Sequence, residues 1–170
     1  MRGPFGRDRD GRLRLRLPAE GVGLLEAILV DLRGRVEDSE DPDHRRLYPP
    51  AYTDEAEEAR FRDLTRGYLV AAKQGAIDVV LDVLARGAVR RGMFEAALTD
   101  AEAEALLGAL NDARLVLGTA LEVTDDEQPV GFLPPDDPKA PRVNAYIWLG
   151  AAQEALLELL LRELGPAGSD

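Results

Sequence analysis

Residues 106–119 read LLGALNDARLVLGT, and this stretch decides the fold because it sets charged side chains beside an apolar helix face. At about 100° per residue, a helix here carries an apolar stripe with Arg114 inside it, Asn111 at its edge and Asp112 toward the back. The stripe consists of Leu106, Leu110, Leu117 and Leu121. A guanidinium buried without an acceptor costs several kcal/mol, so the pattern predicts a polar network between packed helices.

A second helix supplies the expected partners of this network. With Ile77 at the centre of that helix's apolar stripe, Lys73 falls on the stripe and Asp78 lies at its edge. We expect Lys73 and Arg114 to pair with carboxylates from neighbouring helices. The candidate carboxylates are Asp78, Asp82 and Asp112.

The network of Asn111, Asp112, Arg114, Lys73 and Asp78 has two interpretations. Buried ion pairs commonly fix the register of packed helices, so the first interpretation is structural. In the second, the fork formed by Asn111, Asp112 and Arg114 binds a partner's carboxylate or phosphate.

Hydrophobic periodicity predicts a mainly α fold, a compact single domain over residues 1–170 with four to five helices and a minor two-stranded β element. The expected helices cover residues 18–36, 53–86, 99–121 and 142–164, and the expected strands cover residues 12–17 and 92–98. Thr53 and Thr99 are the expected N-caps, with Glu102 completing a capping box. We expect loops at residues 38–50 and at the acidic, proline-rich residues 122–141, the latter flexible, and a frayed end at residues 165–170.

Charge is distributed unevenly along the chain. The net charge is −11 over 170 residues, yet residues 1–16 hold six arginines and two aspartates, a net of +4. Strict alternation in RLRLRL, residues 12–17, puts Arg12, Arg14 and Arg16 on one strand face. This row is either a solvated edge that discourages aggregation or a contact surface for DNA phosphates or an acidic protein. Because the remaining chain is acidic, protein partners are favoured, and DNA contact is expected only through this basic segment.

The absence of cysteine restricts the chemistry of the chain. With no cysteine and one histidine, disulfides, thiol nucleophiles and thiolate metal sites are excluded. The two serines, Ser39 and Ser169, lie in no GxSxG motif, and there is no glycine-rich phosphate loop. We therefore expect a non-enzyme without metal or cofactor. Residues 1–10 are charged and the apolar run 155–161 is short, so we expect a cytoplasmic protein without membrane contact.

Four ordered segments carry a resemblance to a known family: LYPPAY at residues 47–52, FRDLTRGYL at 61–69, ALNDARLVLGT at 109–119 and YIWLGAAQEALL at 146–157. In sequence and spacing they resemble the actinobacterial AosR family, long catalogued as a domain of unknown function and later named for transcriptional regulation in the oxidative-stress response. The resemblance implies a non-enzymatic cytoplasmic regulator. Some members of that family are held to sense oxidants through paired cysteines, a mechanism that a cysteine-free chain excludes.

Two functional hypotheses follow from these observations. In the first, the protein regulates transcription by binding a protein partner such as the transcription machinery, or by touching DNA. In the second, it is a non-catalytic adaptor or assembly protein without a role in gene control, as its acidic surface, proline-rich loop and apolar final helix suggest. The broad apolar arc of that final helix is also consistent with a homodimer.

Overall fold

The computed structural model describes residues 3–38, 41, 44–124 and 128–162. Within them the helices are α1 (Ala19–Arg35), α2 (His44–Leu47), α3 (Glu55–Arg86), α4 (Asp100–Ala120) and α5 (Ala140–Leu161), and the strands are β1 (Phe5–Arg7), β2 (Leu13–Pro18), β3 (Ala88–Arg90) and β4 (Met93–Leu98). The mainly helical prediction is confirmed. None of these helices combines the length and the apolarity that crossing a bilayer requires.

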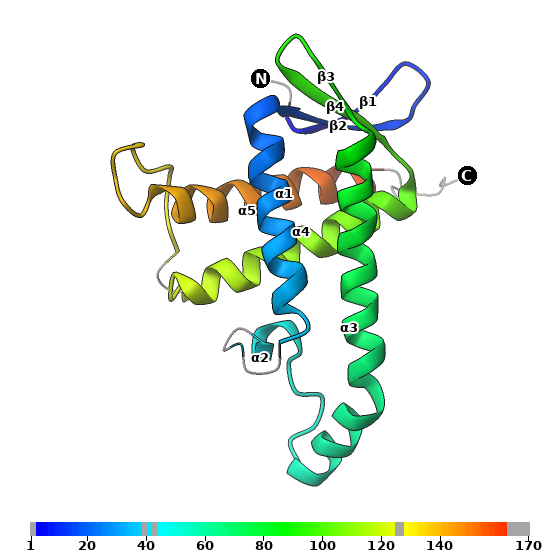
Figure 1. Ribbon diagram of the computed structural model, residues 1–170, viewed down its shortest axis with the longest axis vertical. Helices are drawn as coiled ribbons and strands as arrows, with labels where there is room; N and C mark the ends of the chain where they lie inside the picture. The colour runs from blue at the N-terminus through cyan, green and yellow to red at the C-terminus, as the bar shows by residue number, and fades with distance from the viewer. Residues whose placement is uncertain (1–2, 39–40, 42–43, 125–127, 163–170) are drawn as a thin grey trace, which may run out of the picture.

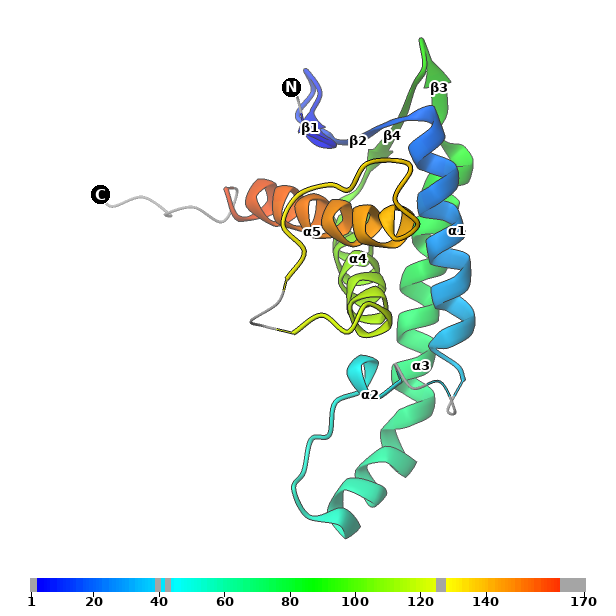
Figure 2. The ribbon, with the colours of Figure 1, turned by 90° about the vertical axis from the view of Figure 1, so that its left-hand side faces the viewer.

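The long helices form two layers, and the sheet lies across one end of both (Figure 1 and Figure 2). α1 and α3 run side by side in one layer, while α4 and α5 cross behind them in the other. The N-terminal part of α3 extends beyond both layers as a projecting arm. Apolar side chains from the four long helices and the sheet meet between these elements, and the most deeply buried include Leu15, Leu29, Ile77, Leu106, Leu149 and Leu156.

The expected two-stranded element is too small, because the sheet has four antiparallel strands in the order β1-β2-β4-β3. The two predicted strands form its central pair, with Leu15 opposite Ala96. β1 and β3 are two further strands of three residues each, one at either edge of the sheet. Their sequences, FGR and AVR, are too short to show alternation, so they become strands by pairing with a formed neighbour.

Alternation along β2 and β4 separates an apolar face from a charged one. The buried face carries Leu13, Leu15 and Leu17 of β2 together with Phe94, Ala96 and Leu98 of β4. The Phe94 ring occupies the space that a Cβ at Gly87 would need, so the turn between α3 and β3 requires glycine. The sheet thereby closes one end of the apolar core and turns its other face outward.

The start of α3 differs from expectation. Asp54, not Thr53, is its N-cap, because the Asp54 carboxylate accepts hydrogen bonds from the N–H groups of Ala56 and Glu57. Just upstream, the expected loop at residues 38–50 contains the one-turn helix α2.

The end of the chain also differs. α5 begins at Ala140, earlier than the expected residue 142, with Pro141 in its first turn, where no helical N–H is needed. The described residues between α4 and α5 form neither helix nor strand. Residues 165–170 lie outside the described residues.

α4 begins with the predicted capping box. Thr99 Oγ1 accepts a hydrogen bond from the Glu102 N–H at 3.2 Å, and the Glu102 carboxylate accepts one from the Thr99 N–H at 2.8 Å. Arg86 at the end of α3 donates to both Glu102 carboxylate oxygens, at 2.8 and 2.7 Å, and to the Ala97 carbonyl. The hydrogen bond from Arg86 lowers the pKa of Glu102 to about 2, so this carboxylate joins α3, β4 and α4 in its ionised form.

We expect Glu102→Gln to lower the free energy of unfolding by about 1–2 kcal/mol at neutral pH. In the folded chain the pKa of Glu102 lies below its ordinary value of 4.5. The carboxylate therefore stabilises the fold fully above about pH 4.5, and this contribution is lost as the pH falls toward 2. Urea unfolding of both proteins across this range should show the difference shrinking. A difference that stays constant would contradict the assigned role.

Candidate functional site

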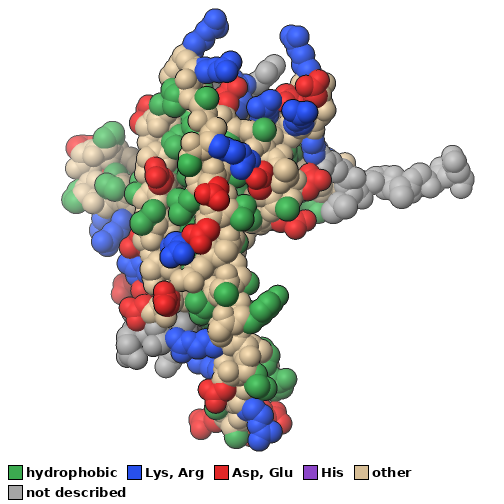
Figure 3. All heavy atoms as spheres, turned by 45° about the vertical axis from the view of Figure 1, so that its right-hand side comes forward, with side chains coloured by type: hydrophobic (Ala, Val, Ile, Leu, Met, Phe, Trp, Pro, Cys, Tyr) green, Lys and Arg blue, Asp and Glu red, His purple; other side chains and the backbone are tan. Residues whose placement is uncertain are grey.

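Lys and Arg side chains gather over the strands at the sheet end of the molecule (Figure 3). Arg14 and Arg16 project from β2 on the outer face, and the strand register sets Arg16 beside Glu95 of β4. Arg16 Nη2 lies 2.9 Å from Glu95 Oε1. Arg14 Nη2 lies 2.8 Å from Asp8 Oδ2 in the turn after β1, and the hydrogen bond from Arg14 lowers the pKa of the Asp8 carboxyl.

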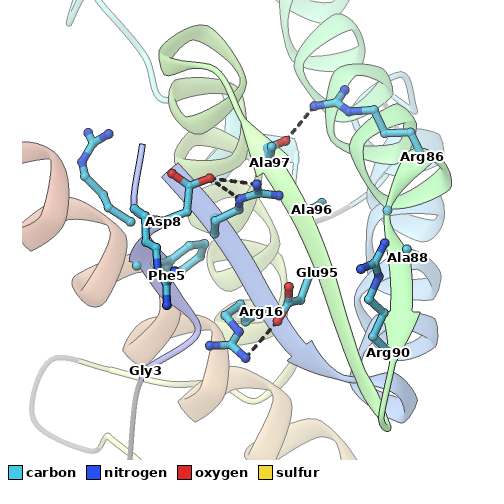
Figure 4. Close-up of a pocket in the computed structure, with 15 residues that line it drawn as sticks. Gly3, Phe5, Asp8, Arg16, Arg86, Ala88, Arg90, Glu95, Ala96 and Ala97 are labelled. Atoms are coloured by element: carbon cyan, nitrogen blue, oxygen red, sulfur yellow. Dashed lines mark hydrogen bonds and ion pairs between the residues drawn. The ribbon is translucent and has the colours of Figure 1, made fainter. Parts of the chain in front are cut away.

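These residues line a hollow of about 1000 Å³ on the outer face of the sheet (Figure 4). Small residues leave it open, among them Gly6, Ala88 and Ala97. Its lining holds six arginines and two carboxylates, a net charge of +4 in a protein of net charge −11. The arginines are Arg7, Arg9, Arg14, Arg16, Arg86 and Arg90, and the carboxylates are Asp8 and Glu95. We call this feature the basic hollow.

Part of the positive charge of the basic hollow is not neutralised within the described part of the chain. Arg9 and Arg90 form no ion pair with any described residue. Arg16 Nε is buried and has no hydrogen-bond partner there. Guanidinium groups bind carboxylates and phosphates through paired N–H donors. The hollow can therefore accept an anionic group without displacing every existing ion pair.

The predicted arginine row lies only partly on this surface. Arg14 and Arg16 line the hollow, whereas Arg12 precedes β2, is exposed and is not part of the lining. Arg86 and Arg90, which the sequence did not single out, join from the end of α3 and from β3. Arg90 could have been found from the strand expected at residues 92–98. The chain reverses directly before that strand, so the residues that precede the turn pair with it, and they join the sheet that β2 and β4 form.

A second group of polar residues lies between the helical layers. Lys73 Nζ of α3 lies 2.7 and 2.9 Å from the two carboxylate oxygens of Asp112 on α4. Asp112 is only 7% exposed, so Lys73 satisfies a carboxylate that has little access to water. The same ammonium group lies 5.6 Å from the centre of the Tyr48 ring. Burial, helped by the nearby Asp112 charge, raises the pKa of Tyr48 to about 12.

Arg114 lies on a different side of α4, and its surroundings differ from expectation. Its guanidinium carbon is 5.1 Å from the ring centroid of Tyr146 on α5. Glycines make room for this contact: a Cβ at Gly150 would lie 3.2 Å from Arg114 Nε, and a Cβ at Gly118 would lie 3.2 Å from the Tyr146 ring. Among the described residues no carboxylate pairs with Arg114, and its buried Nε has no hydrogen-bond partner. An aromatic ring takes the place of the expected carboxylate.

A single stripe therefore does not describe the buried surface of α4. α3 covers the side that carries Asp112, and α5 covers the side that carries Arg114. The apolar stripe alone would place Asp112 on the far side of the helix, in solvent. It is buried because α3 packs against that side.

Two further members of the predicted network lie elsewhere. Asn111 is exposed and accepts a hydrogen bond from Gln153 Nε2 at 3.2 Å. Asp78 pairs with Arg33 of α1 at the surface, with Arg33 Nε 2.6 Å from Asp78 Oδ1, and the hydrogen bond from Arg33 lowers the pKa of Asp78. Within the described part of the chain, neither side chain forms a hydrogen bond or an ion pair with another member of the predicted network. No group of three potential metal-ligating side chains occurs in the part of the chain that the structure describes.

Replacing Lys73 with Met should lower the free energy of unfolding by about 2 kcal/mol, because the buried Asp112 carboxylate loses its cation. Adding Asp112→Asn should recover part of this loss, since an amide carries no charge. In urea unfolding we expect a coupling energy of about 1 kcal/mol or more between the two changes. Arg33→Met, which breaks an exposed pair, is the matched control and should have a much smaller effect. Additive effects of Lys73→Met and Asp112→Asn would show that the contact does not couple α3 to α4.

Comparison with known proteins agrees with the sequence resemblance. The family described as a domain of unknown function, DUF2017, matches residues 1–160. A Mycobacterium tuberculosis protein named oxidative stress regulator AosR is 32% identical over 153 residues, which cover 81% of this chain and 66% of that protein. A Mycobacterium leprae protein, to which the same name is given provisionally, is 32% identical over 165 residues, which cover 89% of this chain and 73% of that protein. No solved structure matches the chain. The resemblance to the AosR proteins is confirmed, and the chain belongs to the DUF2017 family.

Proposed function

We propose that the protein is a non-catalytic cytoplasmic regulator that binds an acidic segment of a partner protein in its basic hollow. The observation that carries the proposal is a lining of net charge +4 in a molecule whose net charge is −11. The names of the mycobacterial relatives, oxidative stress regulators, support the coarser part of the proposal, a regulatory role.

The distribution of charge favours a protein segment over DNA. A DNA duplex carries one negative charge per about 1.7 Å and runs past any single hollow, so its phosphates would also meet the acidic remainder of the molecule. A short acidic peptide confines its charge to the hollow. Arg9 and Arg90, which form no ion pair in the described part of the chain, are the donors available to its carboxylates.

Fluorescence anisotropy with a labelled oligoglutamate peptide tests the binding site. We expect the full chain to bind the peptide, with an affinity that falls between about 50 and 200 mM salt, and the double variant Arg9→Glu, Arg90→Glu to bind at least about tenfold more weakly. Arg66→Glu is the matched control, because Arg66 is an exposed arginine of α3 outside the hollow. An equal loss in the double variant and in the control would contradict the hollow as the site.

The same measurement with a short DNA duplex separates the two partner classes. Tighter binding of the duplex than of the peptide, lost in the double variant, would replace the acidic protein with DNA as the partner. Weaker binding of the duplex supports the protein partner.

Capture from a lysate of the source organism tests the regulatory role apart from the peptide chemistry. With the parent protein as bait we expect subunits of the transcription machinery, and we expect their loss with Arg9→Glu, Arg90→Glu. Recovery of unrelated enzymes would favour the adaptor hypothesis. Equal recovery of transcription subunits by both baits would move the contact away from the basic hollow.

A further inference from the structure

The side of α3 that faces away from the core carries an apolar stripe that no described part of the chain covers. Leu64 is 79% exposed, Tyr68 is 77% exposed and Val79 is 37% exposed. On a helix these three side chains lie in one narrow arc with Ala71 and Gly75 between them. Figure 3 shows hydrophobic side chains on the projecting arm, to which the N-terminal part of this stripe belongs. Exposed large apolar side chains aligned on one helix face mark an interaction surface.

Gly75 lies in the middle of this stripe. A glycine inside a helix costs about 1 kcal/mol relative to alanine. Apart from its own turn of helix, no described atom lies within 4 Å of the position that a Cβ at Gly75 would take, so packing within the chain does not require glycine there, in contrast to Gly87. Gly67 of α3 and Gly108 of α4 have equally open surroundings, so what distinguishes Gly75 is its position within the apolar stripe, where the lack of a side chain permits the close approach of another helix.

We propose that α3 pairs with α3 of a second copy of this chain, in antiparallel orientation about a twofold axis near Ala71. In this register Tyr68 lies level with Gly75 of the partner subunit, and Leu64 lies level with Val79 of the partner subunit. The largest side chain of the stripe thus meets the position without a side chain. Each half of the stripe complements the other half, which is the property that a twofold contact requires.

Charge complementarity supports the same orientation. Asp82 lies at the same angle of the helix as Leu64, and Arg60 lies at the edge of the stripe. Both are exposed, and neither forms an ion pair with any described residue. The antiparallel register brings Arg60 within one residue of the level of the partner's Asp82. A parallel pair in register would instead set Tyr68 level with the partner's Tyr68, with crowding, and would leave Arg60 far along the helix axis from the partner's Asp82.

The proposed contact differs from the homodimer that the final helix suggests from sequence. In α5 the side chains of Leu149, Ala152 and Leu156 are buried in the core of the same chain. Interfaces that bury less than about 1,200 Å² are typically transient, and this contact uses one helix of each copy, so we expect a reversible dimer with a dissociation constant in the micromolar range.

Sedimentation equilibrium of the full chain from about 5 to about 500 µM tests the dimer. We expect the apparent mass to rise with concentration from 18.5 kDa toward twice that value. Gly75→Leu should weaken the dimer at least about tenfold while preserving the fold, because its side chain enters open space in the monomer. Gly108→Leu is the matched control, an exposed helical glycine of α4 that also has open space around it, and should leave the dimer unchanged.

Charge exchange and cross-linking test the register. Arg60→Asp and Asp82→Arg should each weaken the dimer, and the two together should restore it. Since the chain has no cysteine, an introduced Ala72→Cys is its only thiol and should form a disulfide across the axis under mild oxidation. Leu64→Cys alone should not, because the two copies of residue 64 would lie about 22 Å apart along the helix axes.

Either of two outcomes overturns the proposal. The first is a mass of 18.5 kDa at every concentration. The second is a dimer that Gly75→Leu leaves unchanged, which would place the contact between the copies elsewhere.

Discussion

Helix α4 must bury several of its sides at once, and the other elements are arranged to meet that requirement. α3 covers the side with Asp112, α5 covers the side with Arg114, and the sheet and α1 complete the apolar core. Asp112 and Arg114, the two charged side chains in the C-terminal half of α4, are stabilised by different chemistries. The Asp112 carboxylate accepts hydrogen bonds from the Lys73 ammonium group, whereas the Arg114 guanidinium lies over the Tyr146 ring in a cation–π contact. These two contacts orient α3 and α5 relative to the helix between them.

At the end of the molecule the sheet separates charged from apolar side chains, because its inner face packs on the core and its outer face carries the arginines. One alternation in β2 supplies leucines to the core and arginines to the outer face. The residues that build the fold and those that line the basic hollow are therefore neighbours on one strand. The hollow is concave because glycines and alanines stand between the long arginine side chains. Its positive field is local, set against the acidic remainder of the chain.

α3 contributes to both proposed binding surfaces, the basic hollow and the exposed apolar stripe. Its inner face enters the core and carries Lys73, while its outer face carries the exposed stripe that includes Tyr68. Its last turn supplies Arg86, which links Glu102 of the capping box to the lining of the basic hollow. A helix that is apolar on opposite faces leaves one of them in water unless a partner covers it.

Local patterns predicted much of the fold and part of the candidate site. The alternation of residues 12–17 indicated the strand that presents Arg14 and Arg16, and the Thr99 to Glu102 spacing indicated the start of α4, because strand facing and helix capping depend on residues a few positions apart. The same local reasoning could not supply β1 and β3, whose three residues carry no period of their own.

The sequence by itself determined which segments become long helices and central strands, the uneven charge and the absence of thiol chemistry. Only the tertiary structure decided that Arg86 and Arg90 join Arg16 around one hollow, and that Arg114 meets Tyr146 and not a carboxylate. Periodicity in the sequence predicts on which face of its own helix or strand a side chain lies. Which side chain it meets depends on how distant elements cross, and that follows from the packing of the whole core.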